Sequence, residues 1–278
     1  FLSDLVSGNL AFLGGQIPSQ SPKMDFLIQE TMNLFSAFFH SNPDNINTIC
    51  SSLIGWMVDT KEDNIFPIIA TLTDALEFCS IDESIPNQVC AFIQENANGI
   101  KNPDLQQNCS YFLGLLCRRF PSMVGLAQQI MPCVINWWTR ALSKKTGYQD
   151  VLANIASFFL SYALLDPQFP VEFLIGAVQQ FPPTDLLETQ TMCESMINLM
   201  SKGVDYPQEL IIEMALALSR LFIESQSHLE SRKIEPEVFG KSIELFKMLM
   251  QNEQIQQTVL SRYDSRKAKK NQLIQFLS

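Results

Sequence analysis

The sequence has little glycine and carries more acidic than basic residues, and each feature disfavours a class of protein. Glycine accounts for 11 of the 278 residues, which disfavours glycine-rich nucleotide loops and turn-dense β folds. The net charge of −10 argues against binding nucleic acid through its phosphates, because that needs a surface rich in lysine and arginine. An acidic chain instead suits a basic partner, or serves solubility alone.

Catalytic and metal-binding patterns are also missing. The only histidines are His40 and His228, and no two of the seven cysteines form a CxxC pair, so a zinc site has no supporting spacing. The motifs GxSxG and HExxH and the P-loop do not occur. We therefore expect no enzyme activity, no metal and no cofactor. The cysteines lie mostly in apolar runs, which predicts buried free thiols and a reducing compartment, cytosol or nucleus.

No apolar run is long enough for a membrane span, which needs about 18 residues. The longest run, 151–165, is interrupted by Asn154, Ser157 and Ser161. The chain opens with FLSDLVSGNL, which has neither Met nor the basic leader of a signal peptide. We expect a C-terminal fragment of a longer protein, without membrane insertion.

What the sequence does contain is apolar helical spacing along its whole length, with 46% apolar and 17% charged residues. Proline, Asp and Asn mark many of the expected helix starts. The short polar segments between the apolar stretches predict helices in pairs, each an A helix followed by a B helix. Residues 251–278 are expected to form a terminal cap. The pairs are 1–16 with 22–41, 44–59 with 62–79, 85–100 with 103–119, 123–142 with 148–166, 169–181 with 185–202, and 207–226 with 235–250.

Two similar B helices give the repeat length. NCSYFLGLLCRRFP starts at Asn108 and NIASFFLSYALLDP at Asn154, a separation of 154 − 108 = 46 residues, which is one HEAT or armadillo period. Both are apolar on nearly every side, as expected when neighbouring repeats cover a helix on several sides. We predict an all-α HEAT-repeat α-solenoid, a superhelix of about six helix pairs plus the cap, as a single domain over 1–278. A compact bundle is the alternative, but bundles rarely hold twelve helices in strict sequence order.

Three stretches resemble the C-terminal HEAT repeats of the importin-β (karyopherin-β) superfamily, nearest the importin four and five type. They are DLQQNCSYFLGLLCRRFP, YQDVLANIASFFLSYALLDP and VEFLIGAVQQFPPTDLLET. The residues that match are Asn108, Leu113, Gly114 and Leu116 in the first, Asn154 and Ala156 in the second, and Leu174, Pro182, Asp185 and Glu188 in the third. Ala153, Ser157 and Phe181 depart from the family pattern.

The resemblance implies a nuclear transport receptor that shuttles between cytoplasm and nucleus. Such receptors bind basic protein cargo, here of a histone or ribosomal-protein kind, on an acidic face made by B helices. They bind Phe-Gly nucleoporins in apolar slots between A helices. Ran GTPase engages mainly the N-terminal arch, which we expect to be missing from this chain.

Six carboxylates on the predicted B helices are the candidate cargo-binding residues: Asp74, Glu77, Glu188, Glu194, Glu62 and Asp63. If the B helices line one surface, these side chains share a field that attracts lysine- and arginine-rich cargo. The alternative is that they are solvated helix starts that complement the helix dipole, which suits Glu62 and Asp63 well.

Two other features suggest contacts. Trp137 and Trp138 are about 100° apart on one predicted helix, so we expect one in the core and the other as a candidate partner contact, unless both pack between repeats. The segment SRYDSRKAKK, 261–270, holds five basic residues and one acidic residue. We interpret this segment as a solvated terminal helix, as a segment that contacts the acidic face of the same chain, or as a nuclear-localisation-like patch.

Other protein-binding functions remain open. The main alternative is a HEAT-repeat scaffold subunit of another multiprotein complex, of the phosphatase, vesicle-coat or condensin type, with a fixed protein partner. An armadillo-like peptide adaptor is a weaker alternative, because the B helices lack a regular Asn.

Overall fold

The computed structural model describes residues 22–41, 46–58, 62–144, 146–186, 188–224, 230 and 232–277. These residues form 13 α-helices and one short 3-10 helix, and none of them lies in a β-strand. The chain divides into two compact units, with the division between Arg140 and Ala141. The continuity of a single solenoid over 1–278 stays a prediction.

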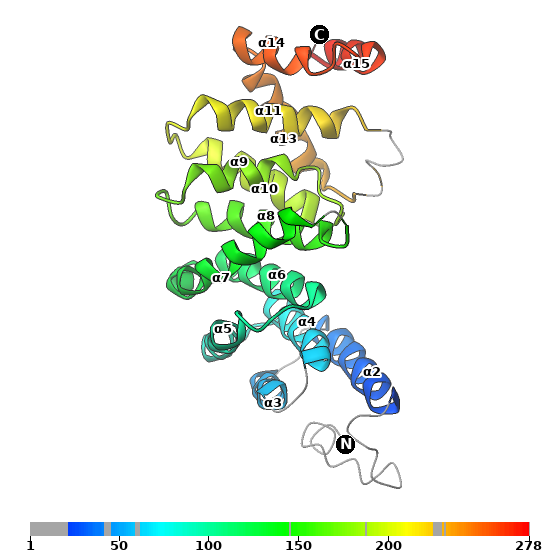
Figure 1. Cartoon of the computed structure of the whole chain (residues 1–278), viewed down its shortest axis with the longest axis vertical. Coiled ribbons are helices and arrows are strands. Elements are labelled where there is room, and N and C mark those ends of the chain that lie inside the picture. Colours follow the sequence, from blue (N-terminus) through cyan, green and yellow to red (C-terminus); the bar gives the residue numbers. More distant parts are fainter. Residues whose placement is uncertain are drawn as a thin grey trace. The chain divides into compact units, whose positions relative to one another are not determined.

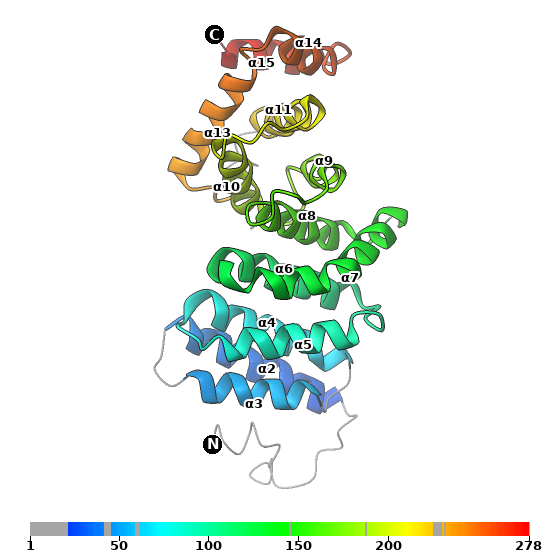
Figure 2. The same cartoon turned by 90° about the vertical axis from the view of Figure 1, so that its left-hand side faces the viewer.

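Unit 1 is a two-layered stack of helices. It contains α2 (Pro22–Phe39), α3 (Ile46–Val58), α4 (Glu62–Phe78), α5 (Ser84–Asn96), α6 (Pro103–Arg119), a 3-10 turn at Pro121–Met123 and most of α7 (Val124–Ser143). The B helices α2, α4 and α6 pack side by side, the A helix α3 packs on α5, and α3 also packs on α4 (Figures 1 and 2). In unit 1, α2, α3 and α4 therefore each contact the helix two positions further along the chain.

Unit 2 repeats this arrangement. It contains α8 (Gln149–Ala163), α9 (Val171–Gln179), α10 (Glu188–Ser201), α11 (Gln208–Phe222), α13 (Pro236–Leu249), α14 (Glu253–Ser261) and α15 (Lys267–Leu277). The B helices α8, α10 and α13 form one layer, while α9, α11 and α14 form the other (Figure 1). The layers meet where α8 packs on α9 and α11 packs on α13.

The predicted all-α, HEAT-like pairing is confirmed. A helix occupies each expected position from 22–41 to 235–250, and the cap 251–278 holds α14 and α15. The expected helix 1–16 lies outside the described residues. The two helices of the fourth pair, α7 and α8, are also present, and the division between the units falls near the end of α7.

Asparagine caps show why helices start where they do. The Asn102 side chain accepts a hydrogen bond from the Asp104 N–H at 2.9 Å, and Pro103 opens α6. Asn252 caps α14 in the same way, accepting from the Gln254 N–H at 3.0 Å. Such caps satisfy backbone donors that have no partner inside the helix, and proline fits the first helical position.

Hydrogen bonds repeat at the length of one helix pair. Several side chains donate to a backbone carbonyl 38 to 42 residues earlier in the chain. The pairs are Cys79 with Phe39, Arg119 with Glu77 and Trp137 with Ala97 in unit 1, and Lys202 with Leu164 and Arg220 with Phe181 in unit 2. Each bond joins a helix to the end of the corresponding helix in the preceding pair, so the repeat is present in the polar contacts as well as in the core.

The apolar character of the B helices α6 and α8 is explained by their burial. In α8, 12 of 15 residues are buried, and in α6, 10 of 17 are buried. The Phe159 ring of α8 lies 5.3 Å from Phe169 and 5.5 Å from Phe173, so aromatic contacts add to the buried area. Within the described ranges, no helix is both long enough and apolar enough to cross a bilayer.

Candidate functional site

Asp74 and Glu77, here called the acidic pair, lie on α4. They are three positions apart, so they project about 60° from each other on the same side of the helix. Both are half-buried. The Tyr111 hydroxyl of α6 donates to Glu77 Oε2 at 3.0 Å, and Arg119 donates to the Glu77 backbone carbonyl. The structure thus brings the predicted pair together beside α6, with one of its two carboxylates already hydrogen-bonded.

The other four predicted carboxylates do not join them in one cluster. Glu62 and Asp63 lie in the first turn of α4, but their side chains are outside the described part of the structure. Glu194 is half-buried on α10 and accepts a hydrogen bond from Gln190 of the same helix at 3.0 Å. Glu188 is only 1% exposed, so its predicted role in an acidic cargo-binding face is wrong.

The position of Glu188 stabilises its carboxylate although the side chain is buried. It is the first residue of α10, where the free N–H groups and the helix dipole favour a carboxylate. It also precedes Glu194 by six positions, which places the two side chains about 120° apart around the helix. They therefore face different neighbours.

Both tryptophans are buried, so the expectation that one is an exposed partner contact is wrong. Trp137 is 1% exposed and Trp138 is 4% exposed. The Trp137 indole N–H donates to the Ala97 carbonyl at the end of α5, at 3.1 Å. This bond satisfies the one polar atom of a large side chain that would otherwise be costly to bury.

Two residues that carry the family resemblance form a structural link in unit 2. Asn154 of α8 is 2% exposed, and its Nδ2 donates to Asp185 Oδ2 at 3.2 Å. The adjacent Thr184 hydroxyl donates to Asp150 Oδ1 at 2.8 Å. These bonds hold the segment between α9 and α10 against α8, so Asp150 and Asp185 are engaged inside the unit.

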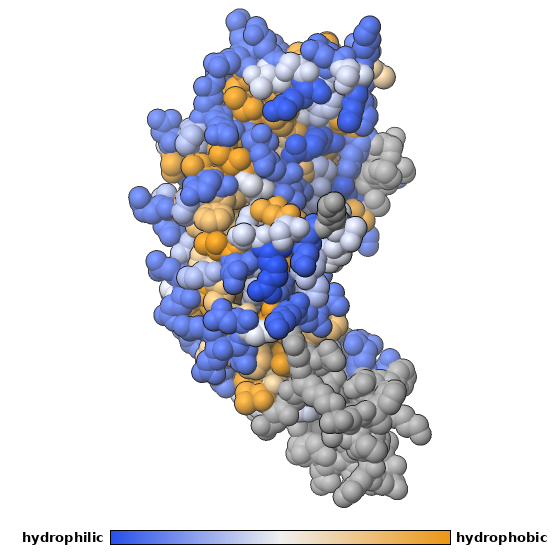
Figure 3. Space-filling view, viewed as in Figure 1, coloured by the Kyte–Doolittle hydropathy of each residue, from blue (hydrophilic) through white to orange (hydrophobic). Residues whose placement is uncertain are grey.

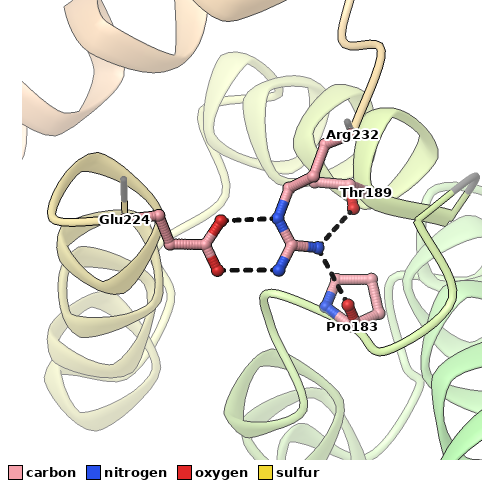
Figure 4. Close-up of polar contacts among 4 residues, drawn as sticks. All are labelled: Pro183, Thr189, Glu224 and Arg232. Atoms are coloured by element: carbon pink, nitrogen blue, oxygen red, sulfur yellow. Dashed lines mark hydrogen bonds and ion pairs between the residues drawn. The ribbon is translucent and has the colours of Figure 1, made fainter. Parts of the chain in front are cut away.

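Arg232 is the main polar residue that the sequence interpretation missed (Figure 4). Its Nε and Nη2 atoms each lie 2.7 Å from an oxygen of the Glu224 carboxylate. Its Nη1 donates to the Pro183 carbonyl at 2.9 Å and to the Thr189 hydroxyl at 3.0 Å. The planar guanidinium suits this bidentate pairing. Arg232 therefore ties the segment after α11 to the start of α10, although its sequence context looks like an ordinary polar loop.

An apolar slot of about 150 Å³ lies in unit 2 between the start of α9 and the segment that leads into α11. Its apolar lining is Ala163, Pro167, Phe169, Val171, Leu174, Val204, Tyr206 and Pro207, and two acidic residues, Asp166 and Asp205, also line it. Partial burial raises the pKa of the Tyr206 phenol. Apolar surface gathers over the region of α9 in Figure 3. Because α9 and α11 are A helices, the slot lies between successive A helices of the unit.

The cysteines are not arranged for chemistry. All seven are free thiols, and all except Cys133 are buried. Burial raises the pKa of Cys50, Cys90, Cys117 and Cys193 to about 12, so these thiols are protonated at neutral pH and are poor nucleophiles. In the described part of the chain, no three His, Cys, Asp or Glu side chains are grouped so that they could hold a metal ion.

Comparison with known proteins gives no relative from which to transfer a function. No protein-family model matches the sequence, and no curated protein is similar to it at a significant level. The function is therefore inferred from the fold and from the surfaces described above.

Proposed function

We propose that this chain is the cargo- and nucleoporin-binding part of a nuclear transport receptor of the importin-β type. In this proposal it is a protein-binding solenoid without catalytic activity or cofactor, and it shuttles between cytoplasm and nucleus. The apolar slot between α9 and α11 is the observation that carries the proposal. Ran GTPase would bind a part of the receptor N-terminal to this chain.

The size and lining of the apolar slot suit one phenyl ring. The slot measures about 150 Å³, and an apolar cavity of about that volume can hold benzene. Val204 is 39% exposed at its rim, whereas Leu174 and Phe169 form buried walls at 2% and 8%. A phenylalanine side chain can thus enter from solvent, and flexible glycines beside it allow the peptide backbone to approach the rim.

The acidic pair supplies the second surface. Asp74 and Glu77 are half-buried, so their attraction for a cation is screened less than that of fully exposed carboxylates. The chain's net charge of −10 adds a long-range field that raises the association rate of basic proteins. A lysine- or arginine-rich segment is the chemistry that such a surface selects.

The slot can be tested by comparing V204D with V58D in the full chain. Both valines are exposed, at 39% and 65%, but Val58 lies at the end of α3 in unit 1. Binding to a Phe-Gly repeat peptide should fall about tenfold in V204D, because the carboxylate must be desolvated when a phenyl ring enters. It should be unchanged in V58D. Equal binding by V204D and the unsubstituted chain would remove the slot from the proposal.

A HEAT-repeat scaffold with a fixed protein partner makes a different prediction. Such a scaffold should bind neither Phe-Gly repeats nor basic peptides, and its partner should remain bound as salt is raised. Failure of both binding assays, in a chain shown to be folded, would therefore favour the scaffold function.

A further inference from the structure

A second and larger hollow lies at the C-terminal end of unit 2. It measures about 1280 Å³ and lies between α11, the end of α9 and the segment from α14 to α15. Four basic side chains line it, and this hollow is called the basic groove: Arg220, Arg262, Arg266 and Lys269. Its volume exceeds the range of about 300 to 1,000 Å³ that is usual for small-molecule sites, so it suits a stretch of peptide.

The walls of the basic groove are held in place by packing. The buried Tyr263 hydroxyl is hydrogen-bonded to Ser219 of α11, with the two oxygens 2.9 Å apart. Further along, the Phe276 ring of α15 stacks on Phe222 of α11 with centroids 4.8 Å apart. These contacts on α11 position the basic residues that lie between Tyr263 and Phe276.

The nearby acidic groups are largely engaged elsewhere. Asp264, the one acidic residue of segment 261–270, is paired with Lys270 at 2.5 Å. Glu224, at the edge of the groove, is paired with Arg232 at 2.7 Å. Glu213 also lines the groove and interacts electrostatically with Arg220, so it offsets part of the positive charge, whereas Asp264 and Glu224 are already paired.

Three cations of the groove are available to a ligand. Arg262, Arg266 and Lys269 are exposed, and their side chains form no hydrogen bond or ion pair with any residue in the described ranges. Arg220 differs, because it donates to the Phe181 and Val178 carbonyls at 2.8 Å and 3.2 Å, but its charge still faces the groove. On the face drawn in Figure 3, the surface over α14 and α15 is mostly hydrophilic.

We infer that the basic groove binds an acidic peptide segment of a partner protein, one in which Asp or Glu alternates with apolar residues. The cations would pair with the carboxylates, while Pro182, Leu216 and Ile223 in the wall would receive apolar side chains. A nucleic acid fits less well, because the wall also holds Glu213 and the whole chain carries a charge of −10. The inference does not rest on the transport function, since basic cargo would be repelled from this groove.

The test uses the full chain and a fluorescent peptide of alternating Glu and Leu, read by anisotropy at low and moderate salt. R266Q/K269Q removes two cations from the groove. K144Q/K233Q removes two exposed cations that do not line it. We expect the groove variant to bind about tenfold or more weakly, because hydrogen bonds between charged groups are lost. The control should change less than twofold, and circular dichroism should show both variants folded.

Three results would overturn the inference. The first is absence of peptide binding by the unsubstituted chain. The second is an equal loss in both variants, which would show a non-specific charge effect. The third is tighter binding of a single-stranded oligonucleotide of equal charge than of the peptide, which would make the groove a phosphate-binding surface.

Discussion

On α4 of unit 1, Asp74 and Glu77 are half-buried side by side, and among the described residues only Glu77 of the two has a side-chain partner, Tyr111. Acidic residues of unit 2 are used differently. Asp185 is bonded to Asn154, Glu188 is buried, and Glu224 forms a bidentate pair with Arg232. Unit 1 therefore presents carboxylates that a partner could reach, whereas several of those in unit 2 hold its helices and loops together.

This difference shows that an acidic residue does not belong to a shared binding surface merely because it lies on a B helix. Whether a carboxylate is available depends on its angle around the helix and on the donors that the neighbouring pair brings to it. Acidic residues outnumber basic ones in both units, but unit 2 also carries a local cluster of cations in the basic groove. Perturbing each unit separately tests this difference between them.

Raising the pH should cause the largest loss in the free energy of unfolding, and the loss should fall mainly on unit 1. Six of the seven cysteines precede Arg140, and only Cys193 lies in unit 2. Burial raises the pKa of Cys50, Cys90 and Cys117 from 9.0 to about 12, and raises that of Cys109 still further. The folded chain thus keeps protons that the unfolded chain releases. The contribution of these buried thiols to the free energy of unfolding is complete below pH 9. It falls as the pH rises towards 12, by on the order of 1 kcal/mol per thiol at pH 10.

Tryptophan fluorescence measures this effect in unit 1 alone, because Trp56, Trp137 and Trp138 all precede Arg140. The urea midpoint should fall between pH 7.5 and pH 10. In a C50A/C90A/C117A variant, the urea midpoint should fall less between pH 7.5 and pH 10, whatever its value at neutral pH. The same pH dependence in this variant as in the unsubstituted chain would show that the thiols are not responsible.

Removing Arg232 should have the next largest effect, confined to unit 2. R232A leaves Glu224 unpaired at a site where the two side chains are only 10% and 17% exposed. We expect a loss of about 2–4 kcal/mol in the free energy of unfolding of unit 2. Alkylation of Cys193 in a urea series measures this loss, because that buried thiol reacts only when unit 2 opens.

Two controls accompany the Arg232 variant. K241A breaks the exposed ion pair of Lys241 with Glu237, at 2.6 Å, and should change the Cys193 midpoint little, because surface pairs contribute little. R232K keeps the charge but loses the bidentate geometry, so its stability should lie between those of R232A and the unsubstituted chain. An R232A midpoint equal to that of K241A would contradict the structural role of Arg232.

Neutralising the acidic pair should have the smallest effect. D74N/E77Q keeps the shape of both side chains and an acceptor for the Tyr111 hydroxyl, so the fold should be unchanged. Binding of a lysine-rich peptide at low salt should weaken several-fold, as expected when two half-buried charges are removed. The control E83Q/E95Q removes two exposed acids at the ends of the A helix α5. Equal weakening in both variants would mean that only the net charge matters.

The fold could be predicted from the sequence because helix starts, helix periods and the 46-residue repeat are local signals. The burial and hydrogen-bond partners of single side chains could not be predicted, because they depend on neighbours about 40 residues away in the sequence. Trp138 was a candidate for exposure and is buried, and Glu188 is covered at the start of α10. Arg232 gave no signal, since its partners Glu224, Pro183 and Thr189 are brought together only by the fold.

Equilibrium binding of the full chain to a Phe-Gly repeat peptide, beside the same peptide with every Phe replaced by Ser, tests the proposed function most directly. The proposal predicts that the Phe-Gly peptide binds, that the Ser-Gly peptide does not, and that binding persists as salt is raised, because the apolar slot carries it. Equal or absent binding of both peptides would contradict the transport function and leave a HEAT-like scaffold with another partner.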